Sequence, residues 1–592
     1  MAIIRILKKY NRILSNQQKI RIIRLIFLMV LGGLFETMSV SLMIPLMNGI
    51  LDTGKMMSKW YVQIFCRLFN VNTSRGFLIC ISIIIAFLFI LKNLYLIFEY
   101  NIQYNFVYKN MFKMQSRLLN IFIHRPYEYF MNVSSAEVIR VIDSDIRSVF
   151  QLLSVLLQLF TELIIALMLI IGIFIISPII TICVAILLLA VVLLIYLTIK
   201  PTLKKQGEIR NHVLGEMYKW LLQSIQGIKE VKVMKKEDYF QSNFDKNGKI
   251  YVRSLSLYSV YSVVPRFIIE GVCLSSMFLA VAIMVFADVD LESLIPVLTA
   301  VAMAAIRLLP SVNRISAALT QLAYGEPSID KVIENMQEIE DFDQAIKSDV
   351  SGLDKPIDEV KSEGSRRIDL KNSINVENLS YHYPSSDAKV LCGVNLSIRK
   401  GDTIGIVGAS GAGKTTLVDL ILGILTPQRG KVLVDGRNIN DNLEEWLDRV
   451  GYIPQTIFML DGTIRENIAF GEDRDAIFDD EVWRALDEAA LKDFIESLPE
   501  GLDAQIGERG VRLSGGQRQR IGIARALYRN PEALIFDEAT SALDNSTEAE
   551  IMEAINNLHG KKTMIIIAHR LTTIEACDYV YRVEEGRIAR EE

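Results

Sequence analysis

The pattern of apolar and polar positions divides the chain into two parts near residue 325. Long apolar runs dominate before that point, and after it charged residues alternate with short apolar runs. A helix needs about 20 apolar residues to cross the bilayer core. The first part is therefore predicted to be a helical membrane domain with six spans. These are Ile22–Leu46, Gly76–Phe98, Leu152–Ile176, Ile179–Ile199, Val263–Ala287 and Leu294–Leu319.

The distribution of lysine and arginine predicts the orientation of the spans. Basic residues are frequent in the N-terminal tail and in Lys200–Arg253, whereas the turns after the third and fifth spans have none. Because positive loops stay in the cytoplasm, the N-terminus and the second part of the chain are expected to be cytoplasmic. The first outer loop, which contains Lys55, Lys59 and Arg67, is a partial exception.

The long connections between spans predict helices that continue into the cytoplasm. Tyr100–Val149 and Lys200–Tyr261 carry apolar residues at helical spacing. Pro126–Phe130 and Glu237–Phe240 are candidate turning points whose aromatic side chains suit a groove of the cytoplasmic domain, although ordinary turns are the alternative. In the outer loop, Leu51–Asn70 has an apolar stripe that fits an interfacial helix or a helix packed on the spans.

The remaining chain reads as a linker and an α/β domain. Residues 1–325 are expected to form the membrane domain with its cytoplasmic extensions. Residues 326–373 are expected to form a charged linker that begins as a helix continuing from the sixth span, and residues 374–592 to form the second domain. That domain opens with an alternating strand pattern at 374–383.

A glycine-rich loop in this domain has the features of a phosphate-binding loop. The buried-strand pattern of Thr403–Val407 leads directly into it, and a helix pattern follows it. Backbone amides at the start of a helix bind phosphate, Lys414 adds a point charge, and Thr415 is a candidate Mg²⁺ ligand. The predicted nucleotide contacts are Gly408, Ser410, Gly411, Ala412, Gly413, Lys414, Thr415 and Thr416.

Further candidate residues follow other strand patterns. Asp537 and Glu538 end the apolar run at 533–536, and we expect Asp537 near Mg²⁺ and Glu538 as the base that polarises the attacking water. Gln455 is a candidate sensor of the γ-phosphate or the metal, and His569 is placed to reach the γ-phosphate. Tyr383 is expected to stack on adenine, with strand packing as the alternative.

Composition excludes several other classes of protein. A net charge of −4 argues against a nucleic-acid partner, which needs a broad basic surface. The six cysteines show no metal-like spacing and no close pairing, as expected in a reducing compartment. The first apolar run is too long for a signal peptide and is followed by no cleavage pattern.

Four cations in or beside the spans are candidate contacts for a transported anion. They are Lys92, Arg266, Arg307 and Arg314. A charged side chain inside a membrane span is energetically costly, so its presence there indicates a function. Arg307 and Arg314 are seven residues apart and share a helix face. A guanidinium fork suits a pyrophosphate. The alternatives are that Arg266 pairs with Glu270 at i,i+4, and that Lys92 and Arg314 extend toward an interface.

The sequence Leu513-Ser-Gly-Gly-Gln517, together with the loop and carboxylates above, resembles the ATP-binding-cassette family over essentially the whole chain. The resemblance implies that ATP lies between one subunit's phosphate loop and the partner's signature residues, here Ser514, Gly515, Gly516 and Gln517. Ser541–Asp544 resembles the loop that passes between the two sites. One membrane domain ahead of one cassette implies an exporter half-transporter. With no motif degenerate, a homodimer that uses ATP and Mg²⁺ is expected.

Local strings within the spans are similar to the bacterial lipid-linked oligosaccharide flippase of protein N-glycosylation. They are Phe35–Pro45, Val264–Gly271 and Arg307–Arg314. This similarity implies flipping of a polyprenyl-pyrophosphate-linked glycan across the bacterial cytoplasmic membrane, with the arginines meeting the pyrophosphate. A multidrug, phospholipid or peptide exporter is the main alternative. A cassette ATPase without a transport function is a further alternative, which six spans argue against.

Overall fold

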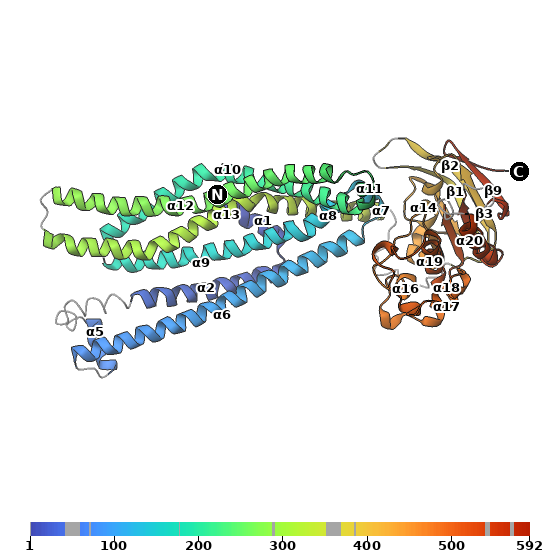
Figure 1. Cartoon of the computed structure of the whole chain (residues 1–592). Coiled ribbons are helices and arrows are strands. Elements are labelled where there is room, and N and C mark those ends of the chain that lie inside the picture. Colours follow the sequence, from blue (N-terminus) through green and yellow to red (C-terminus); the bar gives the residue numbers. More distant parts are fainter. Residues whose placement is uncertain are drawn as a thin grey trace. The chain divides into compact units, whose positions relative to one another are not determined.

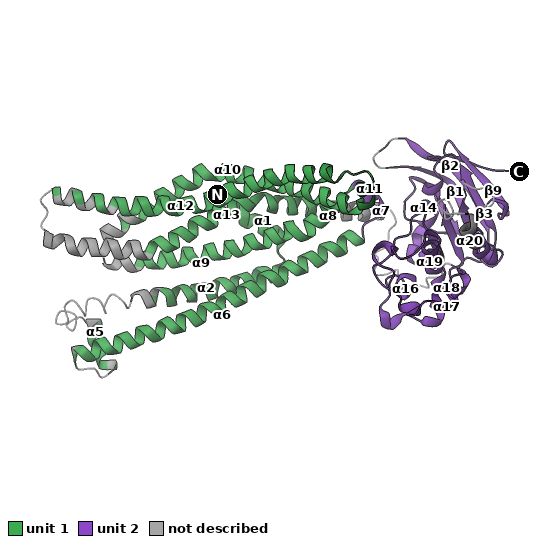
Figure 2. Ribbon diagram, viewed as in Figure 1, with its two compact units in different colours: residues 1–124, 133–353 green, residues 125–132, 354–592 purple. Residues whose placement is uncertain are grey.

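The computed structural model describes most of the chain as two compact units (Figure 2). The described residues are 2–41, 60–69, 73–176, 178–286, 291–350, 369–383, 386, 388–538, 545–568 and 574–591. One unit comprises residues 1–124 and 133–353, and we call it the membrane unit. The other, the ATPase unit, comprises residues 125–132 and 354–592.

The membrane unit is helical throughout its described residues (Figure 1). A short π-helical segment, η1 (Val141–Asp145), joins two of its helices. The α-helices are α1 (Ala2–Ile13), α2 (Asn16–Ser41), α5 (Trp60–Leu68), α6 (Ser74–Ile123), α8 (Ser135–Arg140), α9 (Ile146–Ile176), α10 (Pro178–Gln226), α11 (Ile228–Val233), α12 (Glu237–Phe286) and α13 (Leu291–Val350).

Four helices of the described chain are long and apolar enough to cross a membrane. The stretches are Arg75–Ile123, Ser135–Ile171, Ala185–Gln226 and Glu237–Ser276. They contain the second to fifth predicted spans or most of each. The first and sixth predicted spans fall in α2 and α13, with residues 42–46 of the first outside the described chain. α6, α10 and α12 are each far longer than the bilayer requires and continue beyond the predicted apolar spans.

Two glycines allow these long helices to pack closely. A Cβ at Gly207 of α10 would lie 2.0 Å from the carbonyl oxygen of Tyr324 in α13. A Cβ at Gly325 of α13 would lie 2.4 Å from Leu152 of α9. Small residues let helix backbones approach where a larger side chain would separate them. The sixth-span helix is therefore held closely against both neighbours.

α13 extends beyond the predicted end of the membrane domain. The predicted linker was expected to begin as a helix continuing from the sixth span, and residues 326–350 belong to α13. Glu326, at the start of this extension, is buried and accepts from Lys9 Nζ of α1 at 2.9 Å. A charged residue that the sequence pattern assigned to a linker is thereby paired inside the helical bundle. The domain boundary at residue 325 stays a prediction.

The described residues of the ATPase unit form two sheets. The four-stranded sheet has the order β2-β1-β4-β5, with antiparallel pairs. The six-stranded sheet has the order β10-β9-β3-β8-β7-β6 and is parallel except for β9–β10. The strands are β1 (Ser373–His382), β2 (Lys389–Arg399), β3 (Thr403–Gly408), β4 (Arg429–Val434), β5 (Arg437–Asn438), β6 (Val450–Ile453), β7 (Ala533–Asp537), β8 (Thr563–Ile567), β9 (Tyr579–Glu584) and β10 (Arg587–Arg590).

The helices of the ATPase unit divide between two apolar cores. α14 (Lys414–Leu422) packs with strands of both sheets, whereas α19 (Gly515–Tyr528) packs in a second core with α17 and α20. The other helices are α7 (Tyr127–Asn132), α15 (Leu443–Leu447), α16 (Ile464–Ile468), α17 (Asp479–Glu488), α18 (Lys492–Glu496) and α20 (Asn545–Leu558), with short 3-10 turns at 439–441, 474–476, 501–503 and 508–510.

Candidate nucleotide site and its connections

The predicted phosphate loop joins β3 to α14. Gly408 ends the strand with φ of 151°, and a Cβ there would lie 2.4 Å from the Val583 carbonyl oxygen. Gly411 and Gly413 have φ of 81° and 103°, values that favour glycine. Ser410 and Gly411 are exposed, with Ala412 half-buried behind them. The loop therefore turns sharply and leaves its backbone open at the N-terminus of a helix, where phosphate binds.

The Lys414 side chain folds back onto the backbone of the phosphate loop. Its Nζ donates to the carbonyl oxygens of Gly408 and Ala409, each at 3.0 Å. The side chain is buried, and these two carbonyls compensate part of the cost of burying its charge. An incoming phosphate would offer the ammonium a stronger partner than a neutral carbonyl.

Asp537 is held beside the loop by two hydroxyl groups. Thr415 Oγ1 donates to its Oδ1 at 3.4 Å, and the Tyr452 hydroxyl donates to its Oδ2 at 3.5 Å. Burial raises the pKa of Asp537, and repulsion by the neighbouring Glu538 raises it further. Burial and Asp537 together raise the pKa of Asp419 to about 6. Sequence reasoning did not identify Tyr452 or Asp419, because a strand tyrosine and a helix aspartate carry no motif.

This group of residues fits Mg²⁺. A hydroxyl and a carboxylate are ligands that Mg²⁺ takes alongside phosphate oxygens, and it needs few protein ligands. A cation would also relieve the repulsion among the three neighbouring carboxylates. No group of three or more His, Cys, Asp or Glu side chains suited to a metal occurs in the described parts of the chain. Thr415 and Asp537 would hold Mg²⁺ together with phosphate oxygens of a bound nucleotide.

Gln455 and Glu538 lie side by side at the ends of neighbouring strands. Gln455 Nε2 donates to Glu538 Oε2 at 2.7 Å. The strand pairing causes this proximity, because Ile453 of β6 pairs with Phe536 of β7. Glu538 has φ of 51°, an unusual backbone conformation for a residue other than glycine. The two predicted catalytic residues are thus brought together next to Asp537.

The signature residues begin α19. Ser514 is its N-cap: its hydroxyl accepts from the Gln517 backbone N–H at 3.2 Å, and the Gln517 side chain accepts from the Ser514 N–H at 2.8 Å. This reciprocal pair is a capping box. Ser514 and Gly515 are exposed, whereas Gly516 is buried. The helix N-terminus is consequently rigid and open to a partner.

Tyr383 is engaged by the loop helix through its hydroxyl. The Tyr383 hydroxyl and Thr416 Oγ1 are 2.8 Å apart, and its ring meets Tyr381 edge-on at 5.2 Å. Its stacking on adenine stays a prediction. His569 and the loop Ser541–Asp544 lie outside the described residues, so their predicted roles also stay predictions.

The turning point predicted at Pro126–Phe130 contacts the cassette. It forms α7, which belongs to the ATPase unit. Glu128 Oε1 accepts from the Tyr381 hydroxyl at 3.2 Å and lies 3.4 Å from the Thr426 backbone nitrogen, which donates to it. Burial and Glu128 raise the pKa of Tyr381 well above its usual value. Within the ATPase unit, this segment therefore contacts a strand next to the nucleotide site.

The candidate cations of the membrane unit are each paired where their side chains are described. Lys92 Nζ lies 2.7 Å from Glu36, Arg266 Nε 2.9 Å from Glu270, and Arg314 2.6 Å from Glu162. Asn313 also donates to Glu270 at 3.3 Å. The side chain of Arg307 lies outside the description.

The side chains of Arg266 and Arg314 remain largely exposed although each forms an ion pair. The Arg266 and Arg314 side chains are 63% and 65% exposed, whereas Glu162 is 7% exposed. Lys92 is largely buried. Arg266 and Arg314 can therefore contact a ligand while they stay in their ion pairs, because their side chains are largely exposed. Lys92 is less able to do so because its side chain is largely buried.

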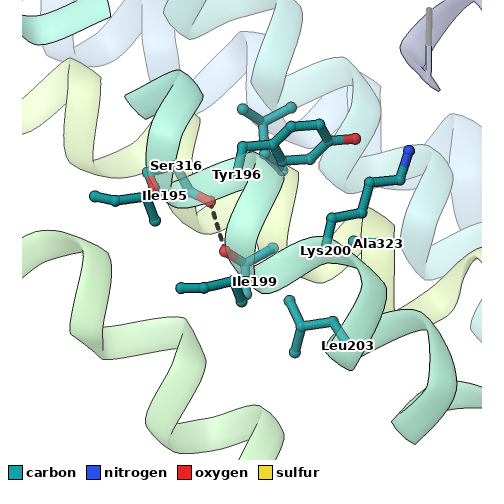
Figure 3. A pocket seen from close by; sticks show the side chains of 9 residues that line it. Ile195, Tyr196, Ile199, Lys200, Leu203, Ser316 and Ala323 are labelled. Carbon is teal, nitrogen blue, oxygen red and sulfur yellow. Dashed lines mark hydrogen bonds between the residues drawn. The ribbon is translucent and has the colours of Figure 1, made fainter. Parts of the chain in front are cut away.

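A small cavity between α10 and α13 contains none of the predicted site residues (Figure 3). Its lining includes Tyr196, Lys200, Leu203 and Ser316. Thr320 Oγ1 donates to the Ser316 carbonyl at 2.9 Å, and Lys200 Nζ lies 5.4 Å from the centre of the Tyr196 ring. The Thr320 hydroxyl and the Lys200 ammonium thus each have a neighbour within this helix crossing.

The ATPase unit combines a phosphate loop, a carboxylate pair and a capped signature helix. Helices of membrane length precede it in the chain. These features define a membrane protein with a cassette-type ATPase domain. Residues 391–541 match the family described as ABC transporter, and residues 22–306 match the ABC transporter transmembrane region. Together the two matches cover more than half of the chain. The chain therefore belongs to the ABC transporter family. Its membrane unit followed by one ATPase unit is the arrangement of an exporter half-transporter.

Curated relatives resemble parts of the chain. An ATP-dependent lipid A-core flippase of Methylobacillus flagellatus is 33% identical over 397 residues, covering 66% of this chain and 63% of the relative. A putative multidrug export ATP-binding/permease protein of Staphylococcus aureus is 42% identical over 238 residues, covering 40% of this chain and 41% of the relative. The matches therefore span less than two thirds of each relative.

A solved structure resembles the whole chain. It is a bacterial Atm1-family ABC exporter with ATP bound, with a TM-score of 0.71 and 22% sequence identity. The similarity covers 97% of this chain and 95% of that chain. At this identity the likeness concerns the fold, which is confirmed as a helical exporter membrane domain fused to an α/β ATPase domain.

Proposed function

We propose that two copies of this chain form an ATP-driven exporter in the bacterial cytoplasmic membrane. The exposed cap of α19 supports the dimer, because Ser514 and Gly515 are free to face the nucleotide on a partner's phosphate loop. Each ATP would then be bound by Lys414 of one subunit and the signature serine of the other. Mg²⁺, held by Thr415 and Asp537 and approached by Gln455, would offset phosphate charge.

ATP hydrolysis in this proposal uses Glu538 as the base. Its carboxylate polarises the attacking water, while the Gln455 side chain, now hydrogen-bonded to it at 2.7 Å, orients the carboxylate or turns to the nucleotide. The contact of Glu128 with Tyr381 links a membrane-unit connection to this site. Nucleotide-dependent shifts of β1 would reach the membrane helices along that path.

The proposed cargo is a polyprenyl-pyrophosphate-linked oligosaccharide, flipped from the inner to the outer leaflet. The observation that carries this proposal is the exposure of Arg314 and Arg266 even within ion pairs. The two arginines belong to a polar cluster that joins α12 and α13 through Asn313, and joins α13 to α9 through Glu162. Guanidinium groups in such a setting bind a pyrophosphate in a forked geometry.

The relatives support lipid or drug export without selecting the cargo. One is named a lipid A-core flippase and another a putative multidrug exporter. A multidrug exporter is the second candidate, and the exposed apolar residues of α10 and α12 would suit it. The exposed arginines favour the anionic lipid.

The test is reconstitution of the full chain in liposomes with a fluorescent polyprenyl-pyrophosphate glycan in both leaflets. We expect ATP to change the fraction accessible to an external quencher, and Glu538→Gln protein to leave it unchanged. A neutral fluorescent phospholipid and a cationic dye serve as competing cargoes. Movement of either one in place of the glycan would contradict the lipid-linked substrate while leaving the exporter intact.

A further inference from the structure

A basic groove lies between α2 and α6, and its lining includes none of the candidate nucleotide or cargo residues above. It has a volume of about 430 Å³. Its lining includes Arg21 and Arg24 from α2 and Lys109 and Lys113 from α6, all exposed. No carboxylate is among its lining residues. We call it the α2–α6 groove.

Two hydrogen bonds fix the helices on either side of this groove. The Tyr95 hydroxyl of α6 donates to the Leu28 carbonyl of α2 at 2.8 Å. Gln18 Nε2 of α2 donates to Asn110 Oδ1 of α6 at 2.8 Å. Asn110 is itself buried and donates to the Phe106 carbonyl at 2.6 Å. The groove is therefore a built feature of the helix pair.

The floor of the groove is apolar and its rim is cationic. Leu25 and Phe106 are buried in the floor, with Leu28 and Ile102 half-buried beside them. A free inorganic anion would gain nothing from this apolar surface. A molecule with an anionic head and a hydrocarbon chain would use both parts.

The rim cations form no ion pair with any residue in the described chain. Some other cations of the membrane unit have carboxylate partners, such as Lys9 with Glu326 and Lys92 with Glu36. What distinguishes the groove is that four cations line one cavity whose lining includes no carboxylate. Four like charges gathered without counter-charge repel one another and attract an anion.

The groove lies where the cytoplasmic leaflet would place its headgroups. Arg21 directly precedes the first predicted span, and α2 starts three residues after α1. α1, directly before α2, carries the basic residues Arg5, Lys8, Lys9 and Arg12, and such basic clusters are typical of the cytoplasmic end of a span. Lys109 lies eleven residues, about 16 Å of helix, beyond the end of the second predicted span at Phe98.

We propose that the α2–α6 groove binds the phosphate headgroup of an anionic phospholipid from the cytoplasmic leaflet, with an acyl chain along Leu25 and Phe106. Basic pockets between membrane helices on this side bind such headgroups. Four cations suit two phosphates, so cardiolipin binds more tightly than phosphatidylglycerol. This lipid is a resident ligand, and its binding depends neither on ATP hydrolysis nor on the transported cargo.

The test measures lipid binding to the full-length protein in neutral detergent by native mass spectrometry. Titration with cardiolipin, phosphatidylglycerol and phosphatidylcholine should give affinity in that order. The double variant Arg24→Gln with Lys109→Gln should lower cardiolipin affinity by roughly tenfold or more, because each basic residue near a membrane contributes to anionic lipid binding. Lys109→Gln with Lys113→Gln, both exposed on α6, serves as a second variant should the first not fold.

The matched control removes two cations elsewhere. Lys246→Gln with Lys249→Gln, exposed on α12, changes the net charge equally and should leave lipid binding unchanged. Equal loss in the control, or unchanged cardiolipin binding in both groove variants, overturns the site. Displacement of the lipid by millimolar inorganic phosphate, or equally tight phosphatidylcholine binding, overturns the assignment to an anionic lipid.

Discussion

Gln455 donates a hydrogen bond to the carboxylate of Glu538 at 2.7 Å, across the ends of two parallel strands. The residues are 83 positions apart in the chain. In this arrangement the side chain expected to contact the nucleotide or metal instead holds the proposed base. Binding of a nucleotide would have to compete with this bond, so the pair connects the occupancy of the site to the position of the base.

Replacement of the proposed base should stop hydrolysis without preventing binding. We expect Glu538→Gln to lower ATP turnover at least 100-fold, because the amide cannot accept the proton from water. ATP-bound dimers should persist and be detectable by size-exclusion chromatography. Glu496→Gln, on the exposed side of α18, is the control and should keep normal turnover. Retained hydrolysis in Glu538→Gln would rule out this base.

The contact of α7 with the cassette should couple hydrolysis to transport. We expect Glu128→Ala and Tyr381→Phe each to reduce transport several-fold while basal ATP hydrolysis continues, because both remove the hydrogen bond at 3.2 Å. The double variant should be little worse than Glu128→Ala alone, because that change already removes the bond from Tyr381 as well as the one from Thr426. Liposome transport and ATPase rates measured on one preparation provide the check. Additive losses would show that the two residues act separately.

The ion pair of Arg314 with Glu162 separates two explanations for an arginine in a membrane helix. If Arg314 binds an anionic cargo, Arg314→Gln should reduce cargo-stimulated ATP hydrolysis strongly and Glu162→Gln only weakly. If Arg314 serves to neutralise the buried Glu162, both changes should reduce the melting temperature, and Arg314→Gln should do so more because it strands a buried carboxylate. We expect the first pattern, measured as ATPase stimulation by a pyrophosphate lipid together with thermal unfolding.

The buried carboxylate of Asp419 should make the ATPase unit pH-sensitive when nucleotide is absent. Its folded-state pKa of about 6 lies above the value of about 3.9 expected for unfolded Asp. The folded state therefore binds the proton more tightly, and this residue's effect on stability becomes less favourable as the pH rises from about 4 to about 6. Well above pH 6, Asp419 is ionised in both the folded and the unfolded state, and the full free-energy cost of its buried charge is present.

Asp419→Asn should remove that cost. At pH 7 to 8 we expect the variant to be more stable than the natural protein by about 1–2 kcal/mol, because solvent reaches the half-buried carboxylate and weakens the effect. The advantage should vanish near pH 4. Thermal unfolding of nucleotide-free protein across this pH range measures it, with exposed Asp493→Asn as the control. A stability difference that does not vary with pH would contradict the burial of this charge.

The close approach of α10 and α13 at Gly207 predicts a steric effect. Gly207→Ala places a methyl group within 2.0 Å of the Tyr324 carbonyl oxygen, so the helices must separate. We expect a loss of stability of about 1–3 kcal/mol, the usual cost of overpacking. Gly248→Ala in α12 meets no atom within 4 Å and should be neutral or stabilising by about 0.5–1 kcal/mol. Comparable melting temperatures for the two variants would show that the bundle relaxes freely at Gly207.

Much of the architecture and the local form of the phosphate loop could be predicted from the sequence because the signals are local. An apolar run of membrane length requires a helix wherever it lies, since the bilayer leaves no other way to satisfy the backbone. The phosphate loop at Gly408–Thr415 is likewise a contiguous strand, turn and helix. The signature residues Ser514–Gln517 carry their own capping box within four positions.

Only the tertiary structure decided which distant residues meet. Glu162 and Arg314 are 152 positions apart, and Glu128 and Tyr381 are 253 apart. Such contacts depend on how long helices cross and on which strands pair, and the local pattern of apolar and polar positions does not contain that information. The same holds for the α2–α6 groove, whose four cations are unremarkable in the sequence and form one charged surface because two antiparallel helices align them.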